Sequence, residues 1–347
     1  MLTNTNSMLK KAQKDKYAVG AFNTSNLEFT KAIIRAAEDL KSPVIIQTST
    51  SAIRYAGIEE IYSIVSTIAK KAKVPVALHL DHSPDLAWAK KCLKHNYTSV
   101  MIDASSYSFK KNVSITKSVV REASKFNASV EAELGALRGI EDDVVVKAKD
   151  AFFTDPHDAK RFVGLTGCNS LAISIGTSHG PYKFKGKSKL DFARLEDIRK
   201  VVKVPLVLHG ASSIPRKIVL KAKKFGAIIG DAHGLSDSDL KKAISLGICK
   251  VNIDSDLRLV FYAALREFLY KNPKVYDPRT ILEHTNKAIY DFVCEKIKVL
   301  GSDGKAWFFI FLVLVLLFCL RTLLLLVFLL HQMGLLFAIC FVRLQFL

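Results

Sequence analysis

Residues 74–83 read VPVALHLDHS, a short apolar run that ends in an acid and a histidine. Similar runs, rich in branched apolar residues, recur along the chain and alternate with helical patterns. The predicted strands are Ala18–Phe22, Val44–Gln47, Val76–His79, Ser99–Ile102, Ser129–Glu133, Leu171–Ile175, Leu206–Leu208 and Ile248–Ile253. Near-continuous apolar strands between helices are typical of a parallel sheet. Eight such units favour an α/β fold of the (β/α)8 or TIM barrel type, with extra C-terminal helices, over an open sheet.

The helices between the strands are also visible in the sequence. Apolar residues recur at helical spacing in Leu27–Leu40. A second helix is expected at Asp85–Lys94, with Ser83 and Pro84 as its N-cap and first residue. No GxGxxG motif follows the first strand, which argues against a dinucleotide-binding fold.

Polar side chains stand at the carboxyl end of every predicted strand. Singly, such residues are more often helix caps or satisfied core residues, but in a barrel these ends converge on one face, where active sites form. The joint pattern therefore predicts a shared site. Its members are Asn23, Ser49, Asp81, His82, Asp103, Glu133, His179, His209, Asn252 and Asp254.

Three of these residues have the side chains of a catalytic metal site. His82, His179 and His209 follow the third, sixth and seventh strands, and three imidazoles with an open fourth position are typical of catalytic Zn²⁺. His79 is a competing ligand that we interpret as barrel filling or as support behind the ligands. Asp81 could orient an imidazole or transfer a proton.

Three further carboxylates belong to the same region. Asp103 and Glu133 are interpreted as support for the ligands or as an alternative metal site. The segment EAELGALRGIEDD, residues 131–143, combines a strand end with a glycine-containing loop that carries Glu141. A carboxylate on a mobile loop could act as a general base, and a solvated acidic turn is an equally good interpretation of this loop alone.

Glycines beside the histidines predict phosphate binding, because backbone N–H groups can approach an anion there. Gly180 and Gly210 are followed by Lys183 and Ser212. The run NIDSDLR, residues 252–258, precedes a helix whose N-terminus would attract phosphate. It carries Asn252, Asp254, Ser255 and Arg258. Two phosphate pockets beside one metal describe a bisphosphorylated open-chain sugar.

Composition excludes several classes of protein. Half of the 347 residues are hydrophobic, which excludes a mainly disordered chain. Six cysteines without a CxxC pair argue against a disulfide scaffold or a zinc–thiolate site and favour a reducing compartment. The net charge of +19 is spread over lysine doublets typical of solvated helix faces, and no nucleic-acid-binding motif accompanies it. The N-terminus lacks an apolar signal core, so a cytoplasmic location is expected.

The composition changes abruptly after residue 305. Residues 306–330 carry a single charge, Arg321, and are long enough to span a bilayer core of about 30 Å. Residues 306–347 are either a membrane anchor or a non-native extension, such as a frame or splice-boundary error, and we favour the second. The expected organisation is a barrel over residues 1–305 followed by this hydrophobic tail.

The motifs together resemble the class II fructose-1,6-bisphosphate aldolases, the zinc-dependent family, in their shorter subgroup. The resemblance covers residues 1–305 and rests on motifs in the same order along the chain. They are YAVGAFN, PVIIQTS, VALHLDHS, SVMIDAS, VEAELGALRGIEDD, AISIGTSHGPYKF, LVLHGASS and KVNIDSDLR. Tagatose-1,6-bisphosphate aldolases share nearly all of them, so they remain the alternative.

The resemblance implies a role for each matching residue. His82, His179 and His209 match the zinc ligands. Asp81 matches the acid/base at the C4 oxygen, and Glu141 the mobile-loop base that takes the C3 proton of dihydroxyacetone phosphate. The residues that match the pocket for the phosphate of that triose are Gly180, Lys183, Gly210, Ser212 and Ser255.

The remaining matches concern the rest of the substrate and the assembly. Asn252 and Asp254 match residues that hold the triose or the substrate hydroxyls, and Asn23 and Ser49 match positions near the second phosphate. Arg258 resembles an arginine that reaches this phosphate from a neighbouring subunit. The family also implies a monovalent cation, Na⁺ or K⁺, and a homodimer or homotetramer.

The sequence departs from the family at Arg138, where a second glycine is usual, at His233, where an apolar residue is common, and in the tail. A rival of another class is an inactive, membrane-tethered barrel that acts as a binding module. An inactive barrel would lack one or more of the catalytic or metal-binding residues, whereas Asp81, Glu141 and the three histidines are all present.

Overall fold

The structure is a computed structural model of the whole chain. It describes residues 2–135, 152–177, 190–229, 234–306 and 320–322, and the backbone alone of residues 139–141 and 144–146. The chain divides into two compact units, Met1–Lys305 and Ala306–Leu347.

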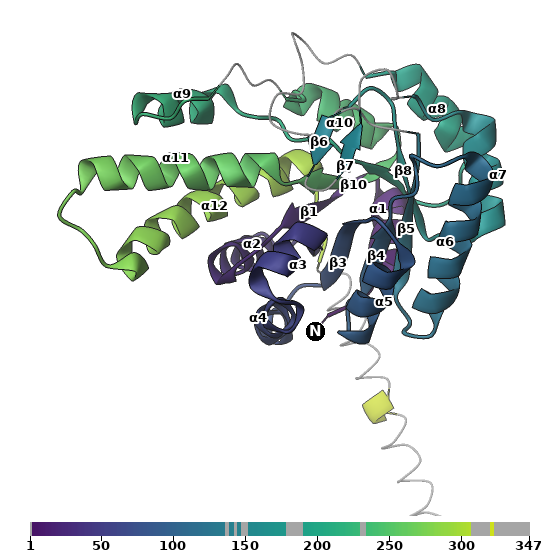
Figure 1. Cartoon of the computed structure of the whole chain (residues 1–347), viewed down its shortest axis with the longest axis horizontal. Helices are drawn as coiled ribbons and strands as arrows, with labels where there is room; N and C mark the ends of the chain where they lie inside the picture. Colours follow the sequence, from purple (N-terminus) through teal and green to yellow (C-terminus); the bar gives the residue numbers. More distant parts are fainter. Residues whose placement is uncertain are drawn as a thin grey trace, which may run out of the picture. The chain divides into compact units, whose positions relative to one another are not determined.

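The first unit contains a closed barrel of parallel strands in the order β1-β10-β9-β8-β5-β4-β3-β2 (Figure 1). The strands are β1 (Val19–Asn23), β2 (Val44–Ser49), β3 (Val76–Ser83), β4 (Ser99–Ile102), β5 (Ser129–Leu134), β8 (Ser170–Ile173), β9 (Leu206–Leu208) and β10 (Ile248–Ile253). The predicted barrel is confirmed. The largest difference in bounds is in β3, which continues four residues beyond His79.

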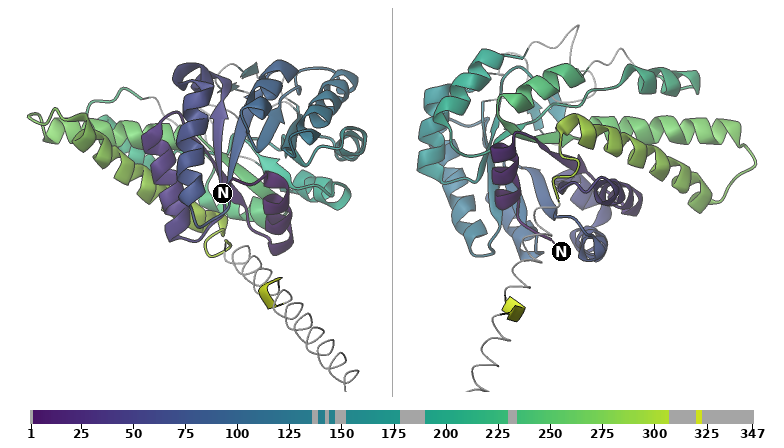
Figure 2. Two further views of the ribbon diagram at one scale, coloured as in Figure 1. Left: turned by 90° about the horizontal axis from the view of Figure 1, so that it is seen from below. Right: turned by 180° about the vertical axis from the view of Figure 1, so that it is seen from behind.

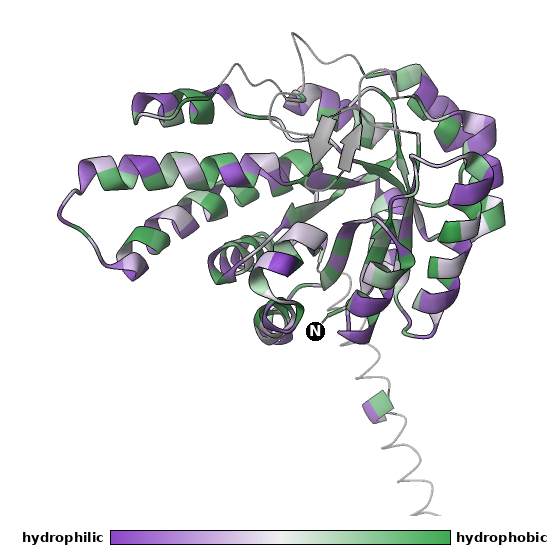
Figure 3. Cartoon of the chain, in the orientation of Figure 1, coloured by the Kyte–Doolittle hydropathy of each residue, from purple (hydrophilic) through white to green (hydrophobic). Residues whose placement is uncertain are grey.

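The helices lie outside the barrel, and most of them turn apolar residues toward it (Figures 2 and 3). They are α1 (Thr5–Asp15), α2 (Leu27–Asp39), α3 (Thr50–Ala56), α4 (Ile58–Lys71), α5 (Leu86–Lys94), α6 (Phe109–Ser124), α7 (Pro156–Thr166), α8 (Phe192–Val201), α9 (Arg216–Lys224), α10 (Asp237–Ser245), α11 (Ser255–Lys271) and α12 (Pro278–Leu300). The last two pack together and extend beyond the strands (Figures 1 and 2). They are the extra C-terminal helices that the sequence predicts.

The prediction for the start of α5 was wrong. Ser83 is the last residue of β3, and the N-cap is Asp85, whose Oδ1 accepts a hydrogen bond from the backbone N–H of Trp88 at 2.9 Å. The strand continues because its pairing with β4 extends to Ser83. An aspartate is as good an N-cap as a serine, so the cap lies two residues later than predicted and the helix begins at Leu86.

Helix α1 closes the amino-terminal end of the barrel. Its Thr5 Oγ1 lies 3.1 Å from Ser99 Oγ and 2.7 Å from Ser129 Oγ, at the first residues of β4 and β5. Met8 and Leu9 pack in an apolar cluster with side chains from β1, β2, β3 and β10. The functional side chains therefore gather at the opposite, carboxyl end.

Two short strands lie outside the barrel. β6 (Gly139–Glu141) and β7 (Val144–Val146) form an antiparallel pair in which Glu141 is opposite Val144. The sequence suggests a loop punctuated by glycines here, whereas the backbone of these two segments is a hairpin. Arg138 lies outside the described residues.

Of the hydrophobic tail, the structure describes Ala306 and residues 320–322, and the latter three are helical and exposed. Within the described ranges, no helix combines the length and the apolar character needed to cross a membrane. Residues 307–319 and 323–347 lie outside those ranges, so the interpretation of the tail stays a prediction.

The closure by α1 can be tested with Leu9, which is 1% exposed. Leu9→Ala should lower the free energy of unfolding by about 2–5 kcal/mol, because it removes apolar contacts and leaves a cavity. Chemical denaturation of the full-length chain measures this loss. The exposed neighbour Lys10→Ala is the control, and equal effects of the two substitutions would contradict the packing described.

Candidate active site

Two consecutive residues at the end of β3, Asp81 and His82, both contribute to the candidate site, although strand alternation would turn them to opposite faces. The register between β3 and β4 shifts between Leu80 and Ser83, and His82 has a left-handed φ of 45°. Such a conformation is costly for a residue with a Cβ and is typical of functional sites. The irregularity brings the imidazole of His82 beside the carboxylate of Asp81.

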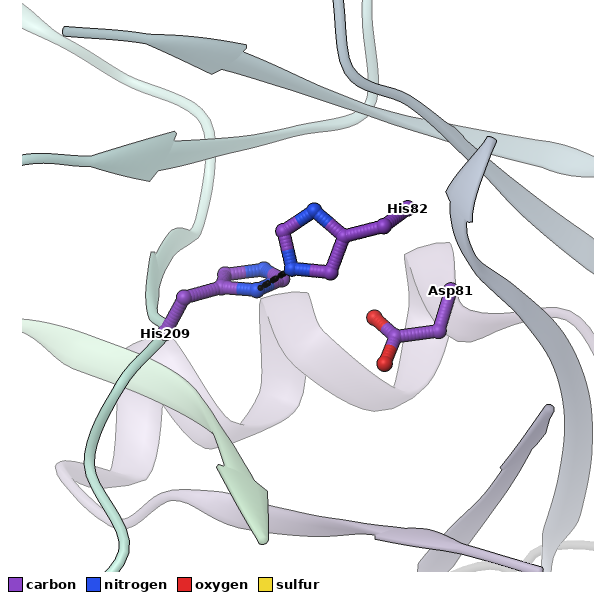
Figure 4. Close-up of side chains that lie close together, drawn as sticks. All are labelled: Asp81, His82 and His209. Carbon is purple, nitrogen blue, oxygen red and sulfur yellow. Dashed lines mark hydrogen bonds between the residues drawn. The ribbon is translucent and has the colours of Figure 1, made fainter. Parts of the chain in front are cut away.

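The centre of the site is a contact between two imidazoles. His82 Nε2 lies 2.8 Å from Nδ1 of His209, the residue that follows β9 (Figure 4). The rings are 4.5 Å apart between centroids and 75° between planes. His209 is completely buried, and His82 is 6% exposed.

The outer nitrogen of each ring faces a carboxylate. His82 Nδ1 lies 3.1 Å from Asp103 Oδ2, and His209 Nε2 lies 2.7 Å from Glu131 Oε1. Because an ionised carboxylate can only accept, these outer nitrogens donate. His82 Nε2 and His209 Nδ1 then face each other with their lone pairs. Two lone pairs at this distance repel each other unless a proton or another cation lies between them.

The surroundings of the two rings shift the pKa values of His82 and His209 in opposite directions. Burial disfavours the imidazolium of His82, but the carboxylates of Asp81, Asp103 and Glu133 outweigh it and raise its pKa to about 10. Burial and the neighbouring His82 hold the pKa of His209 well below its usual value. Without a metal, His82 therefore carries the proton that bridges the rings.

The two acids behind His82 are also perturbed. Burial favours the neutral acid at Asp103, yet the hydrogen bond from His82 brings its pKa below the usual range. Glu133 is buried beside Asp103, and both effects raise its pKa well above the usual value. The pKa values of these two neighbouring acids are therefore shifted in opposite directions.

Amide donors hold the carboxylate of Asp81. Its Oδ2 accepts from Asn23 Nδ2 and from Gln47 Nε2, both at 3.1 Å, and its Oδ1 accepts from Asn252 Nδ2 at 3.0 Å. Among the described residues, Asn252 is the one donor to Oδ1, which keeps a lone pair for a further proton donor. Asp81 is 1% exposed, so its orientation is fixed inside the barrel mouth.

The side chains fit a divalent metal. Ligand atoms of Asp81, His82 and His209 lie within 4.8 Å of one another, as do those of His82, Asp103 and Glu133. Imidazole and carboxylate ligands suit Zn²⁺, and imidazoles whose other nitrogen donates to a carboxylate are typical of zinc sites. Within the described residues, buried oxygens of Gln47, Glu133 and Asn252 have no hydrogen-bond partner, as expected of a site that receives a ligand.

Comparison with known proteins identifies the family. Residues 3–305 match the family model described as fructose-bisphosphate aldolase class-II. The chain belongs to the class II fructose-bisphosphate aldolase family. The fructose-bisphosphate aldolase of Thermus caldophilus is 48% identical, and that of Helicobacter pylori is 42% identical. Each alignment covers 88% of this chain and 100% of the relative.

A solved structure agrees with the fold. The crystal structure of the YdjI aldolase from Escherichia coli K12 is 34% identical and superposes with a TM-score of 0.72. The match covers 88% of this chain and 100% of that chain.

In this class II aldolase, most residues predicted from the strand ends lie in one network. Contacts join Asn23, Asp81 and Asn252 on one side, and His82, His209 and Asp103 on the other, with Glu133 Oε2 4.0 Å from His82. Asn252 Nδ2 also lies 3.1 Å from His209 Nδ1, which links the two groups.

Other predicted residues lie at the carboxyl ends of the strands beside this network. Ser49 is the N-cap of α3, and its Oγ accepts from Ala52 N–H at 3.3 Å. Asp254 precedes α11 and accepts from Arg258 Nε at 2.8 Å, and Ser255 begins that helix. Arg258 is half-exposed on its own chain.

The loop after β9 contains Gly210 and Ser212, both predicted to hold phosphate. Gly210 has a φ of +61°, which favours glycine. The buried carboxylate of Asp256 accepts the backbone N–H groups of Ser213 at 2.8 Å and Ile214 at 2.6 Å. Asp256 therefore fixes this loop, a role that the sequence analysis missed.

Four predicted site residues cannot be placed in this way. His179, Gly180 and Lys183 lie outside the described residues, and of Glu141 only the backbone in β6 is described. His233, where the sequence departs from the family, also lies outside the described residues. Their roles stay predictions.

The sequence analysis also missed Gln47, Glu131 and Lys250. Each lies two residues before a predicted site residue on the same strand: Ser49, Glu133 and Asn252. This spacing puts both members of each pair on the same face of the strand. A polar residue two positions before a site residue in a buried strand could therefore have indicated these three residues in the sequence.

The proton bridge predicts a pH dependence for the metal-free protein. A folded-state pKa of about 10 for His82, above its usual 6.5, gives a stabilisation that is complete below pH 6.5 and is lost as the pH rises to about 10. The loss is up to about 5 kcal/mol. Chemical denaturation of the metal-free chain across this range should therefore show a steeper fall than His82→Asn, which cannot be protonated. Parallel curves would contradict the bridge.

Proposed function

We propose that this protein is a metal-dependent aldolase, a carbon–carbon lyase that reversibly cleaves fructose 1,6-bisphosphate to dihydroxyacetone phosphate and glyceraldehyde 3-phosphate. The observation that supports it best is the group formed by Asp81, His82 and His209, with an acid held beside two facing imidazoles. The family and the names of the relatives support fructose over tagatose bisphosphate.

We assign the metal, one Zn²⁺ per chain, to His82 and His209, with His179 as the third ligand on the sequence evidence. Such a metal, when bound, acts as a Lewis acid that polarises the ketone and stabilises the charge left when the carbon–carbon bond breaks. Asp103 and Glu131 orient the two described imidazoles through their outer nitrogens. Glu133 stands behind His82 as support or as part of a second metal position.

Asp81 is the proposed acid/base in cleavage. Its carboxylate takes the proton of the C4 hydroxyl, and the amides of Asn23, Gln47 and Asn252 keep it oriented for that transfer. Glu141, assigned from the sequence alone, returns a proton to C3 of the triose. Burial of Asp81 excludes bulk water from the transfer.

The two phosphates define the ends of the substrate. We assign the triose phosphate to Gly180, Lys183, Gly210, Ser212 and Ser255, and the second phosphate to the region of Asn23 and Ser49. Asn252 and Asp254 would hold the triose or the substrate hydroxyls. To reach the second phosphate of a neighbouring subunit, Arg258 must leave its ion pair with Asp254.

The remaining proposals rest on the sequence and the resemblance. They are a monovalent cation, Na⁺ or K⁺, a homodimer or homotetramer, and a cytoplasmic location, with membrane association only if the tail is native. No nucleic-acid partner is proposed.

Asp81→Asn tests the acid/base. The amide keeps the size of the side chain but cannot take a proton, so kcat should fall by about 10²–10⁴-fold. Zinc content, measured by atomic absorption, should stay near that of the wild type. Asp197→Asn, at an exposed ion pair on α8, is the control. An Asp81 variant with wild-type kcat would exclude this role.

The sugar is tested by comparing fructose and tagatose 1,6-bisphosphate on the full-length, zinc-loaded chain. We expect kcat/KM for the fructose substrate to be higher by at least about tenfold, since one misplaced hydroxyl among buried polar groups costs about 1.4 kcal/mol or more. The two epimers differ at C4, the carbon on which Asp81 is proposed to act. Equal or reversed values would assign the enzyme to the tagatose branch.

A further inference from the structure

A buried layer of charged side chains lies next to the candidate site. Glu131 of β5 and Lys250 of β10 are 2% and 0% exposed, and Lys250 Nζ lies 2.9 Å from Glu131 Oε2. His79 of β3 is also completely buried, with Nε2 at 3.5 Å from Lys250 Nζ and 3.8 Å from Glu131 Oε2. Its Nδ1 lies 2.8 Å from Ser99 Oγ.

This layer is an unusual way to fill a barrel. Branched apolar side chains normally fill the interior of such a barrel. Here Met101, Ala172 and Val207 form a small apolar cluster on neighbouring strands, and the layer of Glu131, Lys250 and His79 is polar. Taking two charges out of water is costly, and apolar residues of similar size often stabilise a fold as well or better. Packing alone therefore does not explain the pair of Glu131 and Lys250.

The pair is connected to one proposed metal ligand. Glu131 Oε1 lies 2.7 Å from His209 Nε2, while its Oε2 faces Lys250. The same carboxylate thus joins the lysine to the imidazole. Two residues further along β10, Asn252 lies 3.1 Å from the other nitrogen of His209.

We propose that Glu131 and Lys250 form a positioning pair that fixes His209 in the tautomer with hydrogen on Nε2, so that Nδ1 presents its lone pair to the metal. The inference rests on the proposed metal site. Lys250 holds Glu131 as an acceptor turned toward the ring. The carboxylate then forces Nε2 to donate, which leaves Nδ1 as the ligand atom.

The two described ligands are therefore oriented in opposite senses. His82 would bind through Nε2 because Asp103 receives its Nδ1–H, and His209 would bind through Nδ1 because Glu131 receives its Nε2–H. Both residues of the pair act through His209 and touch no substrate, so the expected loss on mutation is in metal binding before chemistry.

The test uses three variants of the full-length chain: Glu131→Gln, Lys250→Met, and the two combined. The glutamine amide can donate to Nε2 and so permits the wrong tautomer, and the methionine removes the charge that orients Glu131. Zinc dissociation constants from chelator competition should rise about 10–100-fold in each. Unfolding temperatures of the metal-free proteins show which variants fold. The double variant leaves no uncompensated buried charge. Its zinc dissociation constant is therefore the one to compare with the wild type if a single variant does not fold.

Lys296→Met is the matched control. Lys296 is also buried and ion-paired, 2.7 Å from Asp237, but it lies in α12 and its ion pair is outside the network of His82 and His209. Its loss should leave the zinc dissociation constant unchanged. An equal weakening in this control would indicate a general effect of losing a buried lysine and would overturn the proposal.

A second readout does not depend on metal. In ¹⁵N-histidine NMR spectra of the metal-free wild type, His209 should carry its proton on Nε2, and Glu131→Gln should lose this preference. Folded variants with wild-type zinc affinity and an unchanged tautomer would overturn the positioning role. A wild type that binds zinc with the expected tautomer but cleaves no sugar bisphosphate would instead overturn the proposed function alone.

Discussion

The contact of 2.8 Å between His82 Nε2 and His209 Nδ1 is the constraint on which the site depends. Two imidazole lone pairs at this distance repel each other unless a cation lies between them. The surrounding acids supply the compensating negative charge: Asp81 and Asp103 near His82, and Glu131 at His209. In the metal-free protein, the raised pKa of His82 shows how strongly this environment favours positive charge. The same environment favours a divalent metal.

This contact depends on a local break in regular structure. Without the register shift in β3 and the left-handed φ of His82, alternation would send Asp81 and His82 to opposite faces of the strand. The strain can be tolerated because β3 is held between β2 and β4 in a closed barrel whose amino-terminal end is filled by α1. The proposed acid and the proposed metal ligand are thereby adjacent in sequence and in space, as the proposed cleavage requires of groups that act on one small substrate.

The sequence was sufficient to predict the barrel and the end of it that carries the site, because strand–helix alternation and polar strand ends are both local patterns. It did not reveal Gln47, Glu131 or Lys250. Barrel strands are buried on both faces, so their near-continuous apolar pattern does not show which residues point inward. The cap of α5 was misassigned because sequence alone does not show that β3 pairs with β4 as far as Ser83. Nor does it encode the backbone angle of His82, which tertiary pairing imposes.

The most direct test of a metal-dependent aldolase is a zinc titration of the chelator-treated, full-length chain, with fructose 1,6-bisphosphate cleavage measured at each step. The account predicts a folded but inactive metal-free protein whose activity rises linearly with added zinc and stops rising at one equivalent per chain. Full activity in the metal-free protein, or a folded protein that takes up zinc without gaining activity, would contradict it.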